Sequence, residues 1–227
     1  MRRVAVILLS LGCLVVGPVM SAGASQSDGS ARPGSSAVFA PQSHPYGISY
    51  SQWAARWSQW AFGTPTPQNA LANPANCNLN QRGPVFMLPT ATGPGVVATC
   101  TVPAGEPMLL APAGSLYTPG DGLNTYSQLL AAAKADTDGL TGISASLDGT
   151  SLPTQPFRTA SPFVLFLSSD NILGSSAGPT RAAIDGYFLM LKALPPGTHV
   201  IKGADSFPDG TSADITITVN VVGHGYR

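Results

Sequence analysis

The stretch that decides the fold is Tyr50-Ser-Gln-Trp-Ala-Ala-Arg-Trp-Ser-Gln-Trp-Ala-Phe62, which holds all three tryptophans of the chain. Spacings of four and three residues place the three indoles on one face of a helix. Ser49 followed by Gln52 matches a capping box, and Gly63 is a residue type that commonly ends helices. The pattern therefore predicts a helix over residues 49–62.

The tryptophan face has two interpretations. Exposed aromatic rings stack on sugars in carbohydrate-binding modules, whereas an aromatic stripe opposite serine and alanine is typical of a helix packed on a core. The amphipathic stripe favours the second interpretation. We therefore expect Trp53, Trp57 and Trp60 to be structural and to seal one open side of two packed sheets, with sugar binding as the alternative.

Most of the chain after this helix is predicted as short strands. Apolar or alternating segments occupy residues 84–88, 96–102, 107–111, 143–147, 150–152, 163–167, 187–191, 199–203 and 215–221. A second capping box at Thr125 and Gln128 predicts one further short helix, ending near Ala135. Because strands and helices do not alternate, the fold class is mainly β: an antiparallel β-sandwich, jelly-roll or immunoglobulin-like, over residues 44–222.

The amino-terminal residues have the features of a secretory signal peptide. Arg2 and Arg3 precede an almost entirely apolar run over residues 4–16, and small residues predict cleavage after Ala24. The run is too short for a confident membrane span, so we expect no stable span after cleavage. Residues 25–43 then form a predicted flexible leader and residues 223–227 a tail. The expected location is extracellular or in the cell envelope.

Cys77 and Cys100 are the cysteines that remain after signal removal. In an oxidising compartment an isolated pair usually forms a disulfide, which would stabilise this chain by about 3 kcal/mol in the chain-entropy picture. The histidines, at positions 44, 199 and 224, lie far apart, and none has a second ligand at metal spacing. We therefore predict a disulfide, no metal site and no cofactor.

The charge pattern excludes some partners. Without Arg2 and Arg3 the chain has nine basic residues against eleven acidic ones, and it contains no run of lysine or arginine. This pattern argues against nucleic acid and against electrostatic attachment to a membrane. The preference for arginine over lysine and the abundance of alanine indicate a bacterial source with a high GC content.

Four polar side chains are the candidate binding residues: Arg158, Asp170, Asp185 and His199. Aspartate beside glycine or asparagine commonly supports a turn, and a buried Arg158–Asp185 pair would be a structural explanation for both residues. Residues 174–178 match G-x-S-x-G, but a proline follows directly and no helix is predicted there. We predict a loop at this motif and no catalytic residue.

Several motifs, in their order along the chain, are similar to those of a protein family. They include Tyr46-Gly-x-x-Tyr-x-x-Trp-x-x-x-Trp-x-x-Trp60, Cys100-Thr-Val-Pro-Ala-Gly105, Asp185-Gly-Tyr187 and Leu194-Pro-Pro-Gly-Thr-His199. Over residues 46–222 the chain resembles an uncharacterised family of secreted bacterial proteins. The resemblance implies a secreted β-sandwich with an amino-terminal tryptophan helix, and it assigns no particular activity.

Two functions follow as hypotheses. The first is a non-catalytic extracellular or cell-envelope interaction module that binds an unknown ligand, either a glycan or a protein. The alternative is a secreted hydrolase or carbohydrate-active enzyme that uses aspartates. The alternative requires that two or more of five residues, the four candidates and Asp121, converge in a concave pocket.

Overall fold

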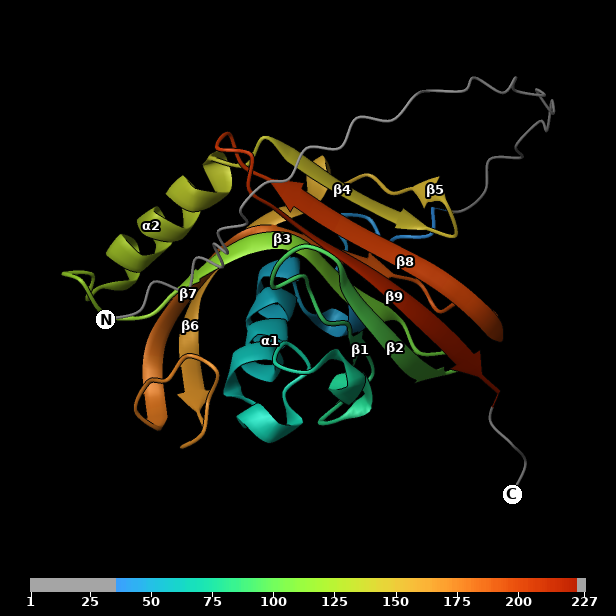
Figure 1. The fold of residues 1–227 in the computed structure, drawn as a ribbon, viewed down its shortest axis with the longest axis horizontal. Coiled ribbons are helices and arrows are strands. Elements are labelled where there is room, and N and C mark those ends of the chain that lie inside the picture. The colour runs from blue at the N-terminus through green and yellow to red at the C-terminus, as the bar shows by residue number, and fades with distance from the viewer. Residues whose placement is uncertain (1–35, 224–227) are drawn as a thin grey trace, which may run out of the picture.

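The computed structural model describes residues 36–223 and contains two β-sheets and two α-helices (Figure 1). The four-stranded sheet has the order β1 (Phe86–Met87), β3 (Met108–Tyr117), β7 (Gly178–Leu191) and β6 (Arg158–Leu167). The five-stranded sheet has the order β2 (Val96–Pro103), β9 (Ser212–Val222), β8 (Gly197–Ser206), β4 (Gly142–Leu147) and β5 (Thr150–Ser151). The predicted mainly β fold with two helices is confirmed.

The pairing of strands is mixed, in contrast to the antiparallel arrangement predicted from the sequence. β1 pairs with β3 in parallel, and β2 pairs with β9 in parallel, whereas the other named pairs are antiparallel. The chain leaves the four-stranded sheet after β1, forms β2 in the other sheet, and returns as β3. Such a crossover through a second sheet lets the returning strand run in the direction of the first.

The two helices cover opposite faces of the four-stranded sheet. Figure 1 shows this sheet curving around α1 (Tyr50–Gly63), while α2 (Tyr126–Asp138) lies on its outer side. α1 contacts β6 and β7, α2 contacts β3, β6 and β7, and the five-stranded sheet packs on β3 through β8 and β4. The tryptophan helix therefore fills the concave face of one sheet. The prediction that it would seal one open side of two packed sheets is wrong.

The first half of β7 is a strand that the sequence did not predict. Residues 178–186 consist largely of small residues. The loop predicted at residues 174–178 reaches their start, and the predicted strand begins only at residue 187. All of them nevertheless pair with β6. An added Cβ at Gly186 would lie 2.7 Å from the carbonyl oxygen of Ala113 and 2.8 Å from Cα of Gly114. Gly186 is the register partner of Gly114 in β3, so the absence of a side chain lets these two neighbouring strands approach closely. The pairing with β3 and β6 imposes the strand.

The predicted capping box at the start of α1 is confirmed, whereas Gly63 is the last residue of the helix and Thr64, in an extended conformation, is its cap. The Ser49 hydroxyl accepts from the Gln52 amide at 3.3 Å, and the Gln52 side chain accepts from the Ser49 amide at 2.8 Å. At the other end the fully buried Asn69 donates through Nδ2 to the carbonyl oxygens of Ala61 and Thr64. Asn69 therefore satisfies carbonyl groups that a helix end leaves unpaired.

Two of the three tryptophans are buried beneath α1. Trp53 and Trp57 are 1% and 2% exposed. The Trp57 ring meets the Phe188 ring of β7 edge-on, with the ring centres 5.9 Å apart, and its Nε1 donates to the carbonyl oxygen of Leu88 at 2.9 Å. The buried indole hydrogen bond and the aromatic contact give Trp57 the structural role that its spacing predicted.

The predicted disulfide between Cys77 and Cys100 is confirmed. It joins the 3₁₀-helix η3 (Pro74–Asn78) to β2, and both sulfur-bearing residues are fully buried. The bond ties the segment that follows α1 to the edge of the five-stranded sheet. It thereby fixes the start of the loop that leads into β1.

The folded domain begins before residue 44, the boundary predicted from the sequence. Val38 is 2% exposed and forms an antiparallel bridge with Leu191. β6 starts opposite Tyr187, so the last residues of β7 have no β6 neighbour, and residues 37–39 occupy that position. The predicted signal peptide, the rest of the leader, His224 and most of the tail lie outside the described residues. Within residues 36–223, no helix has the length and apolarity needed to cross a membrane.

Candidate functional site

Arg158 and Asp185 form the ion pair that the sequence suggested. Asp185 of β7 is 2% exposed, and its Oδ2 accepts from Nε of Arg158 at 3.0 Å and from Nη2 at 2.5 Å. The same guanidinium bonds to Asp138 at 2.6 Å and to the carbonyl oxygen of Lys134, both at the end of α2. Asp185 chiefly raises the pKa of Arg158 above its ordinary value. The cluster anchors the end of α2 to β6 and β7.

His199 lies in the other sheet and pairs with a different carboxylate. Its Nδ1 is 2.7 Å from Oδ2 of Asp148, and its Nε2 is 3.0 Å from the carbonyl oxygen of Pro195. Asp148 occupies the β4–β5 turn in a left-handed conformation and also accepts from the Val200 amide at 2.8 Å. The Asp148 contacts hold the β4–β5 turn to β8, whereas the Pro195 contact is local to the segment that leads into β8.

The His199–Asp148 pair predicts a pH-dependent contribution to stability. The Asp148 hydrogen bond raises the pKa of His199 above 6.5, and the His199 hydrogen bond lowers the pKa of Asp148 below 3.8. The histidine contribution is complete below pH 6.5 and disappears as pH rises through the raised pKa, whereas the aspartate contribution is complete above pH 3.8 and disappears as pH falls through the lowered pKa.

We expect His199→Gln to melt at a lower temperature than the unmodified protein. The difference should be largest between pH 3.8 and pH 6.5, the ordinary pKa values of aspartate and histidine. The difference should shrink towards pH 9, about the upper end of a practical scan. Thermal denaturation of both proteins across pH measures it. A difference of constant size across that range would contradict the ion-pair interpretation.

The remaining predicted site residues lie in separate turns. The main-chain oxygen of Asp170 accepts from the Thr66 amide at 2.7 Å, while its side chain is exposed. Asp121 occupies an exposed turn in a left-handed conformation, and Ser176 of the G-x-S-x-G match lies in an exposed loop. Among the described residues, no group of three His, Cys, Asp or Glu side chains could hold a metal ion. The convergence of candidate residues required by the hydrolase hypothesis is therefore limited to the structural Arg158–Asp185 pair.

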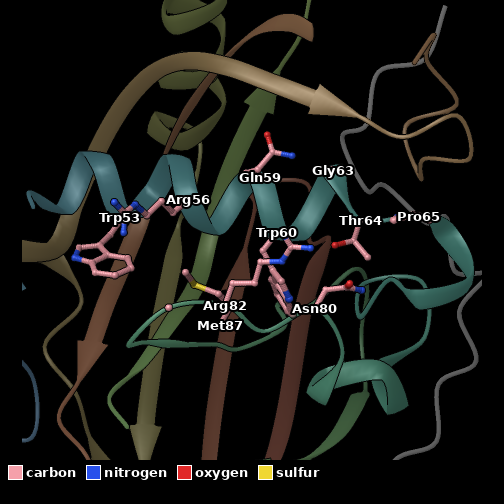
Figure 2. Close-up of a pocket in the computed structure, with 11 residues that line it drawn as sticks. Trp53, Arg56, Gln59, Trp60, Gly63, Thr64, Pro65, Asn80, Arg82 and Met87 are labelled. Carbon is pink, nitrogen blue, oxygen red and sulfur yellow. The ribbon is translucent and has the colours of Figure 1, made fainter. Parts of the chain in front are cut away.

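A concave site lies along one flank of α1, outside the four candidate binding residues and at the helix for which sugar binding was the alternative interpretation. We call it the Trp-Arg groove; its volume is about 500 Å³. One wall is α1 and the other is the segment 80–83 with Met87 of β1 (Figure 2). Its lining residues are Trp53, Arg56, Gln59, Trp60, Gly63, Thr64, Pro65, Asn80, Arg82, Gly83 and Met87.

Trp60 differs from the other two tryptophans. It is half-buried, and its Nε1 donates to the carbonyl oxygen of Leu79 at 3.2 Å. This hydrogen bond holds one edge of the indole, while the rest of the ring lines the Trp-Arg groove. The predicted purely structural role therefore describes Trp53 and Trp57 better than Trp60.

The groove carries two positive charges. Arg56 is exposed, and its guanidinium carbon lies 5.0 Å from the centre of the Trp53 ring, a cation–π arrangement. Arg82 is exposed on the opposite wall, and Figure 2 shows it reaching beneath the helix towards Trp60. Within residues 36–223 neither arginine forms an ion pair, and no lining residue is acidic. The groove therefore has a positive potential.

Two glutamine side chains hold the walls of the groove. Gln59 of α1 donates to the carbonyl oxygen of Phe166 at 2.8 Å and accepts from its amide at 2.9 Å, which fixes the helix to β6. Gln81 makes the same two-point contact with Met87 of β1, at 2.8 Å for both bonds. The walls are thus set by the fold before any ligand arrives.

The sequence contained only part of the signal for this site. Arg56 and Trp60 are four residues apart on the predicted helix, so they could have been placed on one flank. Nothing in the local sequence places Arg82 opposite them. The approach of that loop to α1 depends on the disulfide and on the pairing of β1 with β3.

Comparisons with known proteins identify no family. No protein-family model and no curated protein match the chain. One solved structure, described as PbICP-C in complex with falcipain-2, is similar at 15% identity with a TM-score of 0.24, covering 63% of this chain and 100% of that chain. A similarity at this level supports no conclusion about fold or function.

Proposed function

We propose that this protein is a secreted, non-catalytic binding module of the extracellular space or cell envelope, and that the Trp-Arg groove is its ligand site. The observation that carries the proposal is the combination, in one preformed groove, of an indole ring with two arginines that form no ion pair within the described residues. An exposed charge without an acidic partner in the fold is well placed to meet an anionic ligand.

Two further features support this proposal. The Cys77–Cys100 disulfide is the kind of bond that persists in oxidising compartments, in agreement with the signal-like amino terminus. The groove contains no carboxylate, so it lacks the acid and base that a hydrolase would need. Binding without chemistry is the function that this set of side chains fits.

The proposal is tested by exporting and trapping the protein. The full chain is expressed in a bacterium with its own leader, and the mass of the exported protein is expected to correspond to cleavage after Ala24. The purified product is then incubated with bacterial envelope glycans and with immobilised extracellular polysaccharides, and the bound fraction is measured.

We expect the immobilised glycans to retain the exported protein and to retain less of the Arg82→Gln variant. Arg181 is an exposed arginine of β7 outside the groove, so the Arg181→Gln variant should be retained as well as the unmodified protein. Protein that stays in the cytoplasm with its leader uncleaved would refute secretion. Equal retention of the two variants would refute the groove as the ligand site. Turnover of a glycan by the purified protein would favour the hydrolase.

A further inference from the structure

We propose that the Trp-Arg groove binds an acidic glycan and recognises the carboxylate of a uronate-type pyranose. This inference rests on the proposed function, since it names the ligand class of the same groove. It is carried by three properties of the site: its charge, the aromatic surface of Trp60, and the side-chain bonds that already occupy the main-chain groups of Met87 and Phe166 beside it.

The two guanidinium groups of the groove favour a planar anion such as a carboxylate. Guanidinium groups bind carboxylates through two parallel hydrogen bonds, and Arg56 is held over the Trp53 ring before a ligand arrives. Arg82 supplies a second guanidinium from the opposite wall. A carboxylate between the walls meets positive charge from both sides and no competing acidic side chain of the lining.

The aromatic surface points to a sugar ring. Trp60 is anchored through its Nε1 and lines the groove, and the C–H face of a pyranose stacks on such a surface. The groove follows α1 from Trp53 to Gly63, which is about 15 Å at the rise of an α-helix. A groove of this length accommodates a linear chain with several units better than a single small anion.

The neighbouring strand edges argue against an extended peptide as the ligand. Peptides often bind by adding a strand to an open sheet edge. Here Gln81 occupies the amide and carbonyl of Met87 on β1, and Gln59 occupies those of Phe166 on β6. The groove therefore offers side chains for recognition, and at these two positions no free main-chain edge.

The test uses a purified oligogalacturonide and the same oligosaccharide with its carboxylates fully methyl-esterified. Isothermal titration with the exported protein is expected to show binding of the acid form, and affinity about tenfold or more lower for the ester, because the charge-assisted hydrogen bonds are lost. Arg56→Gln and Arg82→Gln should each weaken binding of the acid form by about tenfold, and added salt should weaken it further. Trp60→Leu should also weaken binding, whereas Arg181→Gln should leave it unchanged.

Three outcomes would overturn the inference. The first is equal binding of the acid and the ester, which would leave a neutral-glycan module and thus the proposed function intact. The second is equal binding of an inorganic polyphosphate or of a short oligothymidylate, which would show recognition of charge without the sugar. The third is no binding of the oligogalacturonide by a protein that retains envelope glycans through Arg82, which would separate the failure of this inference from that of the proposed function.

Discussion

Trp57→Ala is expected to lower the free energy of unfolding by about 4 kcal/mol, because truncating a buried aromatic side chain removes apolar contact and leaves a cavity. The Trp57 ring contacts Trp60, Phe62 and Phe188, and it is 2% exposed. The substitution also leaves the carbonyl oxygen of Leu88 without the indole donor that it has now. Both losses occur at the centre of the contact between α1 and the four-stranded sheet.

The matched control for this substitution is Trp60→Ala on the same helix. Because Trp60 is half-buried, its truncation is expected to cost about 1–2 kcal/mol, less than that of Trp57. Urea denaturation followed by far-ultraviolet circular dichroism measures both, since fluorescence would change with the loss of an indole. Trp57→Phe provides a folded intermediate if Trp57→Ala does not fold. Equal losses for Trp57→Ala and Trp60→Ala would contradict the structural assignment.

Asp185→Ala is expected to lower the free energy of unfolding by about 3 kcal/mol, because it leaves the half-buried guanidinium of Arg158 without its main partner. Asp185 is 2% exposed and receives two hydrogen bonds from that guanidinium. Asp138, the second partner of Arg158, has a side chain that is 64% exposed, so solvent screens its contribution. The buried carboxylate therefore carries most of the effect.

Asp138→Ala serves as the control, with an expected loss below about 1 kcal/mol. The double variant Arg158→Met/Asp185→Ala should be more stable than Asp185→Ala alone, because it no longer contains a half-buried guanidinium that has lost its buried partner. Denaturant titration of the unmodified protein, Arg158→Met, Asp185→Ala and the double variant forms a thermodynamic cycle. Losses of the two single variants that add up to the loss of the double variant would show that Arg158 and Asp185 do not act as an ion pair.

Some features of this fold could be predicted from short stretches of sequence. The capping boxes at Ser49 and Thr125 start the two helices at the expected places, since a cap depends on residues three positions apart. The alternation of residues 215–221 predicted β9, whose apolar side chains are buried as expected. The Arg158–Asp185 pair was also anticipated, although nothing local could show that Asp138 would join it.

Other features arise from contacts between distant residues. Gln59 bonds to Phe166, 107 positions later in the chain, and no local pattern marks a glutamine as the partner of a strand edge. The first half of β7 contains only two β-branched residues, Thr180 and Ile184, among residues that rarely signal a strand. It becomes one because β3 and β6 pair with it and helices cover both its faces.

The sequence by itself determined the tryptophan helix, the disulfide, the β-rich class and the scarcity of positive charge, because each depends on spacing, composition or residue type. Only the tertiary structure decided that the helix lies inside the curve of one sheet and that Arg82 stands opposite Arg56 across a groove. The physical reason is that a groove is formed by two surfaces. The pattern of α1 describes one wall, whereas the position of the other depends on how the Cys77–Cys100 bond and the β1–β3 pairing place a loop from elsewhere in the chain.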